Sequence, residues 1–444
     1  MGGGLMQLVA YGAQDIYLTG QPQITFFKSV YRRHTNFAIE SIQQTINGSV
    51  SAGSRVSVTI SRNGDLLKNL WCQYNPSLLL PQSGNTATVV GSDVSHALFN
   101  YLELEIGGQL IDRQYGLWLT VWRDLTEVNP VGAQGELGIA GEEPPVNSGG
   151  GTSSFDVSPS TRYQRLSYTH QGLPTVTGNG LANAPSEAYV PMRFWFCRNP
   201  GLAIPLIALQ YHEVKFNILF NLASQYVYPS TAASNIANAN FSVYADYVYL
   251  DTTERRQFAQ NAHEYLIDQL QYQSEASSGA SSSSTIRLNF NHPVKELIWV
   301  GTPIALQASS SADNVTGGST PAPITTSSGA YSNMQTKIIL NGTDRFTARN
   351  LKYFTRNQVW DCHTGFGATG TADSIALYSF ALRPEEHQPS GTCNFSRIDT
   401  AQLWFNGSTN SQGSTETINA LTIFAVNYNV LRIMSGMGGL AYSN

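Results

Sequence analysis

The chain has 444 residues, with 25 Lys and Arg against 30 Asp and Glu, so its formal charge at pH 7 is −5. Only 12% of residues are charged and 41% are hydrophobic, which supports a sizeable core and excludes an intrinsically disordered chain. Phosphate binding needs clustered positive charge, so this acidic balance also argues against a protein that coats nucleic acid. The length favours two or three domains, and the many Ser, Thr, Asn, Gln and Gly residues are typical of strands and turns.

The first 26 residues mix glycine with scattered apolar side chains. They lack the positive region and long apolar stretch of a secretory signal, and Met6 stands where a myristoylation motif requires Ser or Thr. The longest apolar stretch of the chain, residues 201–209, is too short to cross a bilayer. We therefore expect a soluble protein made in a reducing compartment, with an N-terminal arm that docks on another surface.

Apolar and polar residues alternate along much of the remaining chain, a pattern typical of half-buried strands. The alternation is clearest at residues 56–60, 102–106, 214–220, 285–290 and 377–382. Helical patterns are few. We predict one helix over residues 115–128 and another over 252–261, the second with Asp251 or Thr252 as its N-cap. Many short strands between Gly, Pro and Asn turns predict an all-β sandwich, barrel or jelly roll.

Three pairs of similar segments follow one another in the same order: 60–71 with 290–299, 105–113 with 339–345, and 194–200 with 378–384. In the first pair, each segment resembles a strand, a polar turn and a second strand that ends in Trp, Trp71 or Trp299. The spacing is nearly constant for the first two pairs and shorter for the third. We infer an internal duplication whose first copy carries an insertion at the Gly/Pro/Ser-rich residues 130–185.

The duplication predicts the domain organisation. We expect an N-terminal arm at residues 1–26 and two similar β domains at residues 27–251 and 263–444. A helical connector at residues 252–262 is expected to join the two domains. Low-complexity runs at residues 274–284 and 308–328 are expected to form exposed loops of the second domain, like the insertion in the first.

Residues suited to metal binding are scattered. The four cysteines lie far apart without a C-x-x-C pair, so we expect buried, reduced thiols: Cys72, Cys197, Cys362 and Cys393. His212-Glu213 and His263-Glu264 lack the second histidine, four residues on, that a zinc site on one helix face needs. His363 has no local partner beyond Cys362 and is expected to be a packed or loop residue.

Catalytic motifs are also missing. Residues 365–370 fit G-x-G-x-x-G, but the sequence that follows reads as a strand rather than the helix of a dinucleotide site, so a flexible hairpin loop is expected. No Walker motif and no G-x-S-x-G occur. The adjacent carboxylates Glu142-Glu143 and Glu385-Glu386 are expected to be solvated loop charges, although two facing carboxylates could serve a glycosidase. We predict no catalytic residues, no metal ligands and no cofactor.

The only basic doublets are Arg32-Arg33 and Arg255-Arg256, and we expect ion pairs between strands or subunits there rather than a stripe that binds nucleic acid. Six Asn-x-Ser/Thr sequons occur, at Asn47, Asn240, Asn314, Asn341, Asn394 and Asn406. Several arise by chance in so polar a chain. Asn314 and Asn406 lie in loop-like sequence and are the candidate glycosylation sites.

Long stretches of the chain resemble the major capsid proteins of large icosahedral DNA viruses, of the chlorella-virus type. They are residues 3–20, 22–28, 31–37, 61–65, 104–108, 200–214 and 427–442. The resemblance runs from end to end and is weakest at residues 130–185 and 308–328.

This resemblance implies an all-β fold of two tandem eight-stranded jelly rolls, with few short helices in loops. It implies a homotrimer whose six jelly rolls form a nearly hexagonal capsomer that tiles an icosahedral shell. Residues 1–26 and the Arg32-Arg33 region would touch neighbouring capsomers or minor capsid proteins at the inner face. The Ser/Gly/Thr-rich loops would face outward, where host-surface glycans are possible partners. The protein would be made in the host cytoplasm, reside in the virion and bind no specific nucleic acid sequence. The resemblance also implies that the protein is glycosylated, in this family sometimes outside the usual sequon.

Two other functions remain open at this point. A jelly roll can also serve as a carbohydrate-binding attachment protein, which would be a monomer or dimer with measurable glycan affinity. A β-sandwich glycoside hydrolase would instead turn over glycosides and lose that activity with one carboxylate.

Overall fold

The computed structural model describes residues 3–78, 89–90, 94–127, 162–167, 187–228, 236–277, 283–303, 307–308, 315–316, 321–322, 324–325, 332–365, 367, 373–407, 413 and 415–442. The chain divides into two units, Met1–Phe37 and Ala38–Asn444. The first unit contains the short helices α1 (Gly3–Val9) and α2 (Ile16–Thr19), neither of which has a buried residue.

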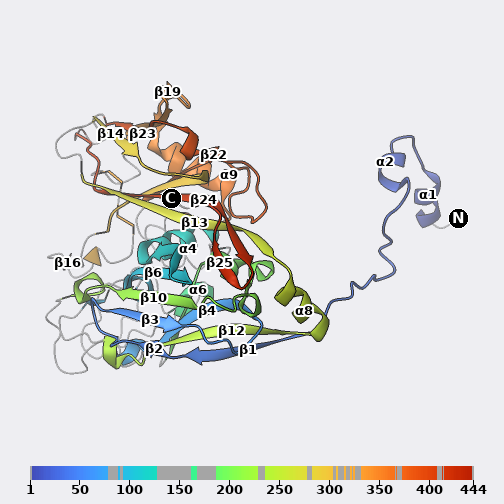
Figure 1. Ribbon diagram of the computed structural model, residues 1–444. Coiled ribbons are helices and arrows are strands. Elements are labelled where there is room, and N and C mark those ends of the chain that lie inside the picture. Colours follow the sequence, from blue (N-terminus) through green and yellow to red (C-terminus); the bar gives the residue numbers. More distant parts are fainter. Residues whose placement is uncertain are drawn as a thin grey trace, which may run out of the picture. The chain divides into compact units, whose positions relative to one another are not determined.

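The second unit begins with a sandwich of two antiparallel sheets (Figure 1). One sheet has the strand order β1-β12-β4-β8, with β9 beside β4: β1 (Phe37–Gln44), β12 (Ser242–Leu250), β4 (Leu66–Tyr74), β8 (Ala188–Pro191) and β9 (Ile204–Pro205). The other has the order β2-β3-β10-β6-β7: β2 (Ile46–Asn47), β3 (Arg55–Thr59), β10 (Val214–Phe220), β6 (Phe99–Ile106) and β7 (Gln109–Tyr115).

A second sandwich follows in the chain. Its first sheet has the order β13-β24-β15-β21, with β22 beside β15 and β25 beside β24: β13 (His263–Glu275), β24 (Leu421–Met434), β15 (Pro293–Gly301), β21 (Ile375–Ser379), β22 (Cys393–Asn394) and β25 (Met437–Leu440). Its other sheet has the order β14-β23-β18-β19, with β20 also paired to β18: β14 (Ser283–Leu288), β23 (Ala401–Asn406), β18 (Gln335–Leu340), β19 (Thr343–Asp344) and β20 (Arg349–Asn350).

The strand order of the two sandwiches is the same. When the strands of each sandwich are matched by their order along the chain, the sheet β1-β12-β4-β8 corresponds to β13-β24-β15-β21. In the same way, β3-β10-β6-β7 corresponds to β14-β23-β18-β19. This order confirms the internal duplication and the all-β prediction. The predicted equivalence of Trp71 and Trp299 is wrong, however. Leu70 and Cys72 fill the first core, so Trp71 between them faces outward, whereas Trp299 is fully buried in the second core.

Each core lies between the two sheets of its own sandwich and is built by alternation. In β6, Leu102, Leu104 and Ile106 are completely buried, as the sequence pattern predicts. Glu103 lies on the opposite face but is only 3% exposed, because Arg55 and Arg113 each bind its carboxylate at 2.8 Å. The outer face of a strand is therefore not always a solvated one.

Both predicted helices are present, as α4 (Gly116–Thr126) and α8 (Thr252–Gln260). Asp251 takes the N-cap position of α8 but makes no capping hydrogen bond with its side chain. The remaining elements are short: α3 (Val94–Ala97), α6 (Arg162–Ser167), α7 (Trp195–Arg198), η8 (Tyr353–Asn357), α9 (Gln358–Cys362), the two-residue strands β5 (Val89–Val90), β11 (Val227–Tyr228), β16 (Gln307–Ala308) and β17 (Val315–Thr316), and the 3₁₀ turns η1 (Pro76–Leu78), η3 (Pro200–Leu202), η4 (Leu206–Ala208), η5 (Ala223–Gln225), η6 (Ile236–Asn238) and η9 (Phe395–Arg397). Within the described part of the chain, no helix has the length and apolar character needed to cross a membrane.

Candidate functional site: the junction between the two sandwiches

Helix α4 lies between the two sandwiches (Figure 1). It starts directly after β7, and Leu119 packs into the first core. Trp118 and Trp122 lie four residues apart on one side of the helix and face the second sandwich, where the ring of Trp118 lies 5.2 Å from that of Phe424. The residues they join on the outer face of the β13-β24-β15-β21 sheet are Ile298, Val300, Ile375, Leu377, Phe424 and Val426. One half of the chain thus covers an apolar face of the other half.

The C-terminal end of α4 is capped by a loop of the second sandwich. The Gly365 N–H donates to the carbonyl oxygen of Leu125 at 2.7 Å, and the Gly367 N–H donates to that of Asp124 at 2.9 Å. These carbonyls belong to the last turn of the helix, where no intrahelical donor is available. A Cβ on Gly365 would lie 2.3 Å from the carbonyl carbon of Leu125, so a residue larger than glycine cannot approach this closely.

Strands β7 and β13 are edge strands of their sheets and meet across the junction. The side-chain amide of Gln269 donates to the Ile111 carbonyl, and the Leu270 N–H donates to a carboxylate oxygen of Asp112 at 3.1 Å. A groove of about 570 Å³ lies beside these contacts, lined by β7, β13 and residues 289–292. Side chains therefore bridge the two edges in place of a continuous ladder of backbone hydrogen bonds.

Asp112 is the buried carboxyl group of this contact. Burial raises the pKa of Asp112 to about 6, although the Leu270 N–H, the Gln114 side chain and the charge of Arg198 all act to lower it. The charged form of Asp112 is thus destabilised by folding at neutral pH.

An ion-paired cluster crosses the junction next to α4. Asp268 in β13 accepts hydrogen bonds from Lys295 at 3.1 Å and from Arg198 at 3.0 Å. Arg198 belongs to α7 of the first sandwich, and its guanidinium lies 5.0 Å from the ring centre of Trp122. Burial acts to raise the pKa of Asp268, but the charges of Lys295 and Arg198 outweigh it, and the pKa falls below its ordinary value. A fully buried lysine is therefore paired with a carboxylate that remains charged.

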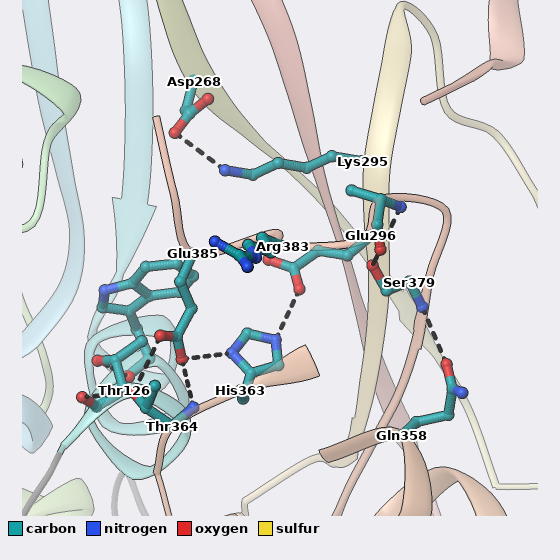
Figure 2. Close-up of polar contacts among 12 residues, drawn as sticks. Thr126, Asp268, Lys295, Glu296, Gln358, His363, Thr364, Ser379, Arg383 and Glu385 are labelled. Carbon is teal, nitrogen blue, oxygen red and sulfur yellow. Dashed lines mark hydrogen bonds and ion pairs between the residues drawn. The ribbon is translucent and has the colours of Figure 1, made fainter. Parts of the chain in front are cut away.

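Beside this cluster, His363 lies between two carboxylates, as Figure 2 shows. Its Nε2 is 2.8 Å from Glu296 of β15, and its Nδ1 is 2.9 Å from Glu385. Burial acts to lower the pKa of His363, but the charge and hydrogen bond of Glu296 and the hydrogen bond of Glu385 outweigh it and raise the pKa to about 9. The imidazole is therefore charged at neutral pH, and both of its N–H groups donate. Glu385 also accepts from the Thr364 N–H at 2.9 Å, which orients the loop that reaches α4.

The polar groups of this junction bind one another and hold the two sandwiches together. Both nitrogens of His363 are engaged by carboxylates, which leaves neither available to a metal ion or a substrate. Across the described ranges, His, Cys, Asp and Glu side chains form no group of three that could hold a metal ion.

Family models match both halves of the chain. Residues 25–251 match the N-terminal part of the major capsid proteins, and residues 254–439 match the major capsid protein of large eukaryotic DNA viruses. The chain is 45% identical to the major capsid protein of Pyramimonas orientalis virus and 43% identical to that of Paramecium bursaria Chlorella virus 1, in each case over the full length of both chains.

The chain belongs to the major capsid protein family of large eukaryotic DNA viruses. A solved structure described as the quasi-atomic model of the chlorella virus PBCV-1 capsid is similar with a TM-score of 0.70 and 39% identity, over 95% of this chain and all of that one. The Faustovirus major capsid protein, with a TM-score of 0.60 and 13% identity, supports the fold alone. The fold is a double jelly roll, and the function is that of a structural capsid protein.

Several residues singled out in the sequence of this capsid protein have structural partners. Glu385 was expected to be a solvated loop charge, but that prediction is wrong, since Glu385 binds His363 at the junction. Its neighbour Glu386 is exposed and pairs with Arg383 at 3.0 Å. At the second basic doublet Arg255 binds Asp65 at 2.9 Å, so an ion pair is found there, but it joins helix α8 to the residue before β4 rather than two strands.

Of the two histidines beside glutamates, His212 hydrogen-bonds to the backbone of Gly438 at 3.0 Å, and His263 to the carbonyl of Phe258 at 2.8 Å. All four cysteines are free thiols, but only Cys72 is fully buried. Glu142, Glu143, Asn314 and most of residues 130–185 and 308–328 lie outside the described residues, as do residues 366 and 368–370 of the glycine motif. Asn406 is exposed at the end of β23.

Asp112, Asp268 and the Lys295-Glu296 pair were not identified from the sequence of this capsid protein. The one available signal was a charged pair inside an otherwise apolar strand, Pro293–Gly301, in which eight consecutive buried residues follow Pro293. Two adjacent charges in such a strand must each find a partner, because an unpaired buried charge is strongly unfavourable.

Proposed function

We propose that three copies of the chain assemble into a nearly hexagonal capsomer, which tiles an icosahedral viral shell. The repeated strand order of the two jelly rolls is the observation that supports this proposal most directly. Two similar halves in each of three copies give six similar edges around a threefold axis, so one building block can meet its neighbours in near-equivalent ways. Permanent interfaces of this kind are usually large and apolar, in keeping with a chain in which 12% of residues are charged.

The proposed division of the chain is an N-terminal arm at residues 1–26, jelly rolls at 27–251 and 263–444, and a connector at 252–262. Strand β1 starts at Phe37 and strand β13 at His263, and helix α8 lies within the proposed connector.

We propose that the arm contacts neighbouring capsomers or minor capsid proteins at the inner face of the shell. Its apolar side chains support this role. Phe26 is 90% exposed, and Leu8 and Tyr17 are 77% and 89% exposed. Exposed apolar residues at this density are typical of a segment that is covered in an assembly. Arg32 and Arg33 follow in the same segment and would add polar contacts to a partner.

The proposed role includes no catalysis and no recognition of a nucleic acid sequence. The relatives named above are structural capsid proteins. The chain carries more acidic than basic residues, which disfavours binding to the phosphate groups of a nucleic acid. We further propose synthesis in the host cytoplasm, contacts of the outer loops with host-surface glycans, and glycan attachment at Asn314 and Asn406. The exposed position of Asn406 supports the second of these attachment sites.

Electron microscopy of the purified chain tests the capsomer proposal. Class averages should show particles with a nearly sixfold outline that pack into hexagonal arrays. Glycan-array binding by a particle that stays monomeric would instead favour the attachment-protein alternative. Intact-mass measurement of protein from infected cells, before and after Asn406→Gln, tests the attachment site.

A further inference from the structure

The second jelly roll has its own counterpart of α4. Helix α4 follows strand β7, and the continuous helical segment η8–α9 follows β20 after only two residues. One side of this segment packs inward, where Phe354 is completely buried in the second core. The other side carries Trp360, which is 86% exposed. The tryptophans that helix α4 of the first jelly roll turns away from its own core, Trp118 and Trp122, are covered by a sheet.

In the first jelly roll, the sheet that corresponds to the one under α4 has no helix packed across the middle of its outer face. The outer face of β13-β24-β15-β21 lies under α4, but in the equivalent sheet β1-β12-β4-β8 the outer face carries half-buried aromatic rings. Trp71 stacks on Tyr244 with ring centres 4.4 Å apart and meets Tyr189 edge-on at 5.4 Å. Helix α8 covers only one end of this face, at Leu66 and Val248.

The two uncovered surfaces lie on opposite sides of the unit formed by Ala38–Asn444. In Figure 1, β1 and β12 lie at its lower side and α9 in its upper part, with α4 and the strands of the first jelly roll between them. Helix α9 is therefore separated from the β1-β12-β4-β8 sheet of its own chain by other elements. The surfaces can meet only between copies.

We propose that η8–α9 of one copy packs on the outer face of β1-β12-β4-β8 of a second copy, with Trp360 as the anchor against Trp71, Tyr244 and Tyr189. The inference rests on the proposed assembly and names the surfaces that make it. The contact between copies repeats the α4 contact within the chain, so six junctions of one kind close the ring. Large aromatic side chains at the centre of an interface carry much of the binding energy.

Sedimentation of the full chain over a range of concentrations tests this contact. Trp360→Ala should raise the dissociation constant for self-association at least tenfold while the circular dichroism spectrum remains native. Leu222→Ala is the matched control, because Leu222 is also exposed, at 63%, but lies outside both surfaces. It should leave the dissociation constant unchanged. A natively folded Trp360→Ala protein that associates as tightly as the unmodified chain would overturn the inference.

Mixed cross-linking provides a second readout that does not depend on affinity. Chains with Trp360→Cys are mixed with chains with Tyr244→Cys and oxidised mildly, in a background in which Cys362 and Cys393 are serine. The mixture should give a disulfide-linked pair that neither variant gives alone. If the unmodified chain forms trimers but no such pair appears, the surfaces are wrong and the capsomer proposal stands. If the unmodified chain is monomeric throughout, the capsomer proposal fails as well.

Discussion

Helix α4 and the segment η8–α9 occupy the same place in two copies of one fold, yet one is covered and the other is open. Trp122 is 4% exposed, whereas Trp360 is 86% exposed. The difference follows from the duplication, because a chain of two halves can satisfy only one of two equivalent junctions internally. The covered junction holds the halves together, and the open one is available for assembly. Stability and assembly should therefore respond separately to changes at the two helices.

The largest effect is expected from breaking the covered junction. Trp122→Ala removes a buried ring that packs between the two jelly rolls, and such a truncation costs about 3 to 5 kcal/mol. Trp360→Ala removes an exposed ring and should change the stability of the monomer by less than about 0.5 kcal/mol. Urea unfolding at concentrations below self-association measures both. Equal losses in the two variants would show that the two helices are not in different environments.

The close approach of the capping loop provides the next test. Gly365→Ala places a methyl group against the α4 backbone and disturbs the bond to Leu125, so we expect a loss of about 3 kcal/mol. Gly342→Ala is the control. Gly342 has a positive φ of 77° but open space around its Cβ position, so the loss should be about 1 kcal/mol, from the backbone conformation alone. Similar losses at both positions would contradict the steric role of Gly365.

The charged His363 makes the junction sensitive to alkali. The pKa of His363 is about 9 in the folded chain against 6.5 ordinarily, so its contribution is fully present below pH 6.5 and is lost as the pH rises through about 9. We expect the free energy of unfolding to fall by about 3 kcal/mol over that window. Glu385→Gln should reduce the fall, while Glu386→Gln, at the exposed neighbouring carboxylate, should not. An unchanged pH profile in Glu385→Gln would contradict the ion-paired state.

Asp112 is expected to act in the opposite part of the pH range and more weakly. Its pKa is raised from 3.8 to about 6, so the folded state is favoured below pH 3.8 and loses that advantage as the pH rises to about 6. Asp112→Asn should remove this component, and the difference from the unmodified chain should reach about 2 to 3 kcal/mol above pH 6. Unfolding midpoints at pH 4, 5, 6 and 7 measure it. A difference that does not vary with pH would mean that Asp112 is not the titrating group.

The fold could be predicted because it depends on short-range periodicity. Alternation placed Leu102, Leu104 and Ile106 in the core, and the repeated segments indicated two similar domains before any strand order was known. The error at Trp71 and Trp299 has a simple cause. Successive strand residues face opposite ways, so an alignment displaced by one position matches two tryptophans that lie on opposite faces.

The junction could not be predicted because its members are distant in sequence. Glu296, His363 and Glu385 come from three segments that only the packing of the second jelly roll brings together. The strand predicted after the glycine motif is present as β21. Glycine is required at position 365 because it contacts the backbone of α4. That contact depends on how the two domains pack, so it could not be predicted from the local sequence.

The mass of the native particle tests the central claim most directly. Native mass spectrometry of the full chain at micromolar concentration should give a particle of three copies of the 48.4 kDa chain, without a stable dimer. The two open surfaces of each copy would then be closed by its neighbours. A folded chain that remains a single copy at every concentration tested would contradict the account.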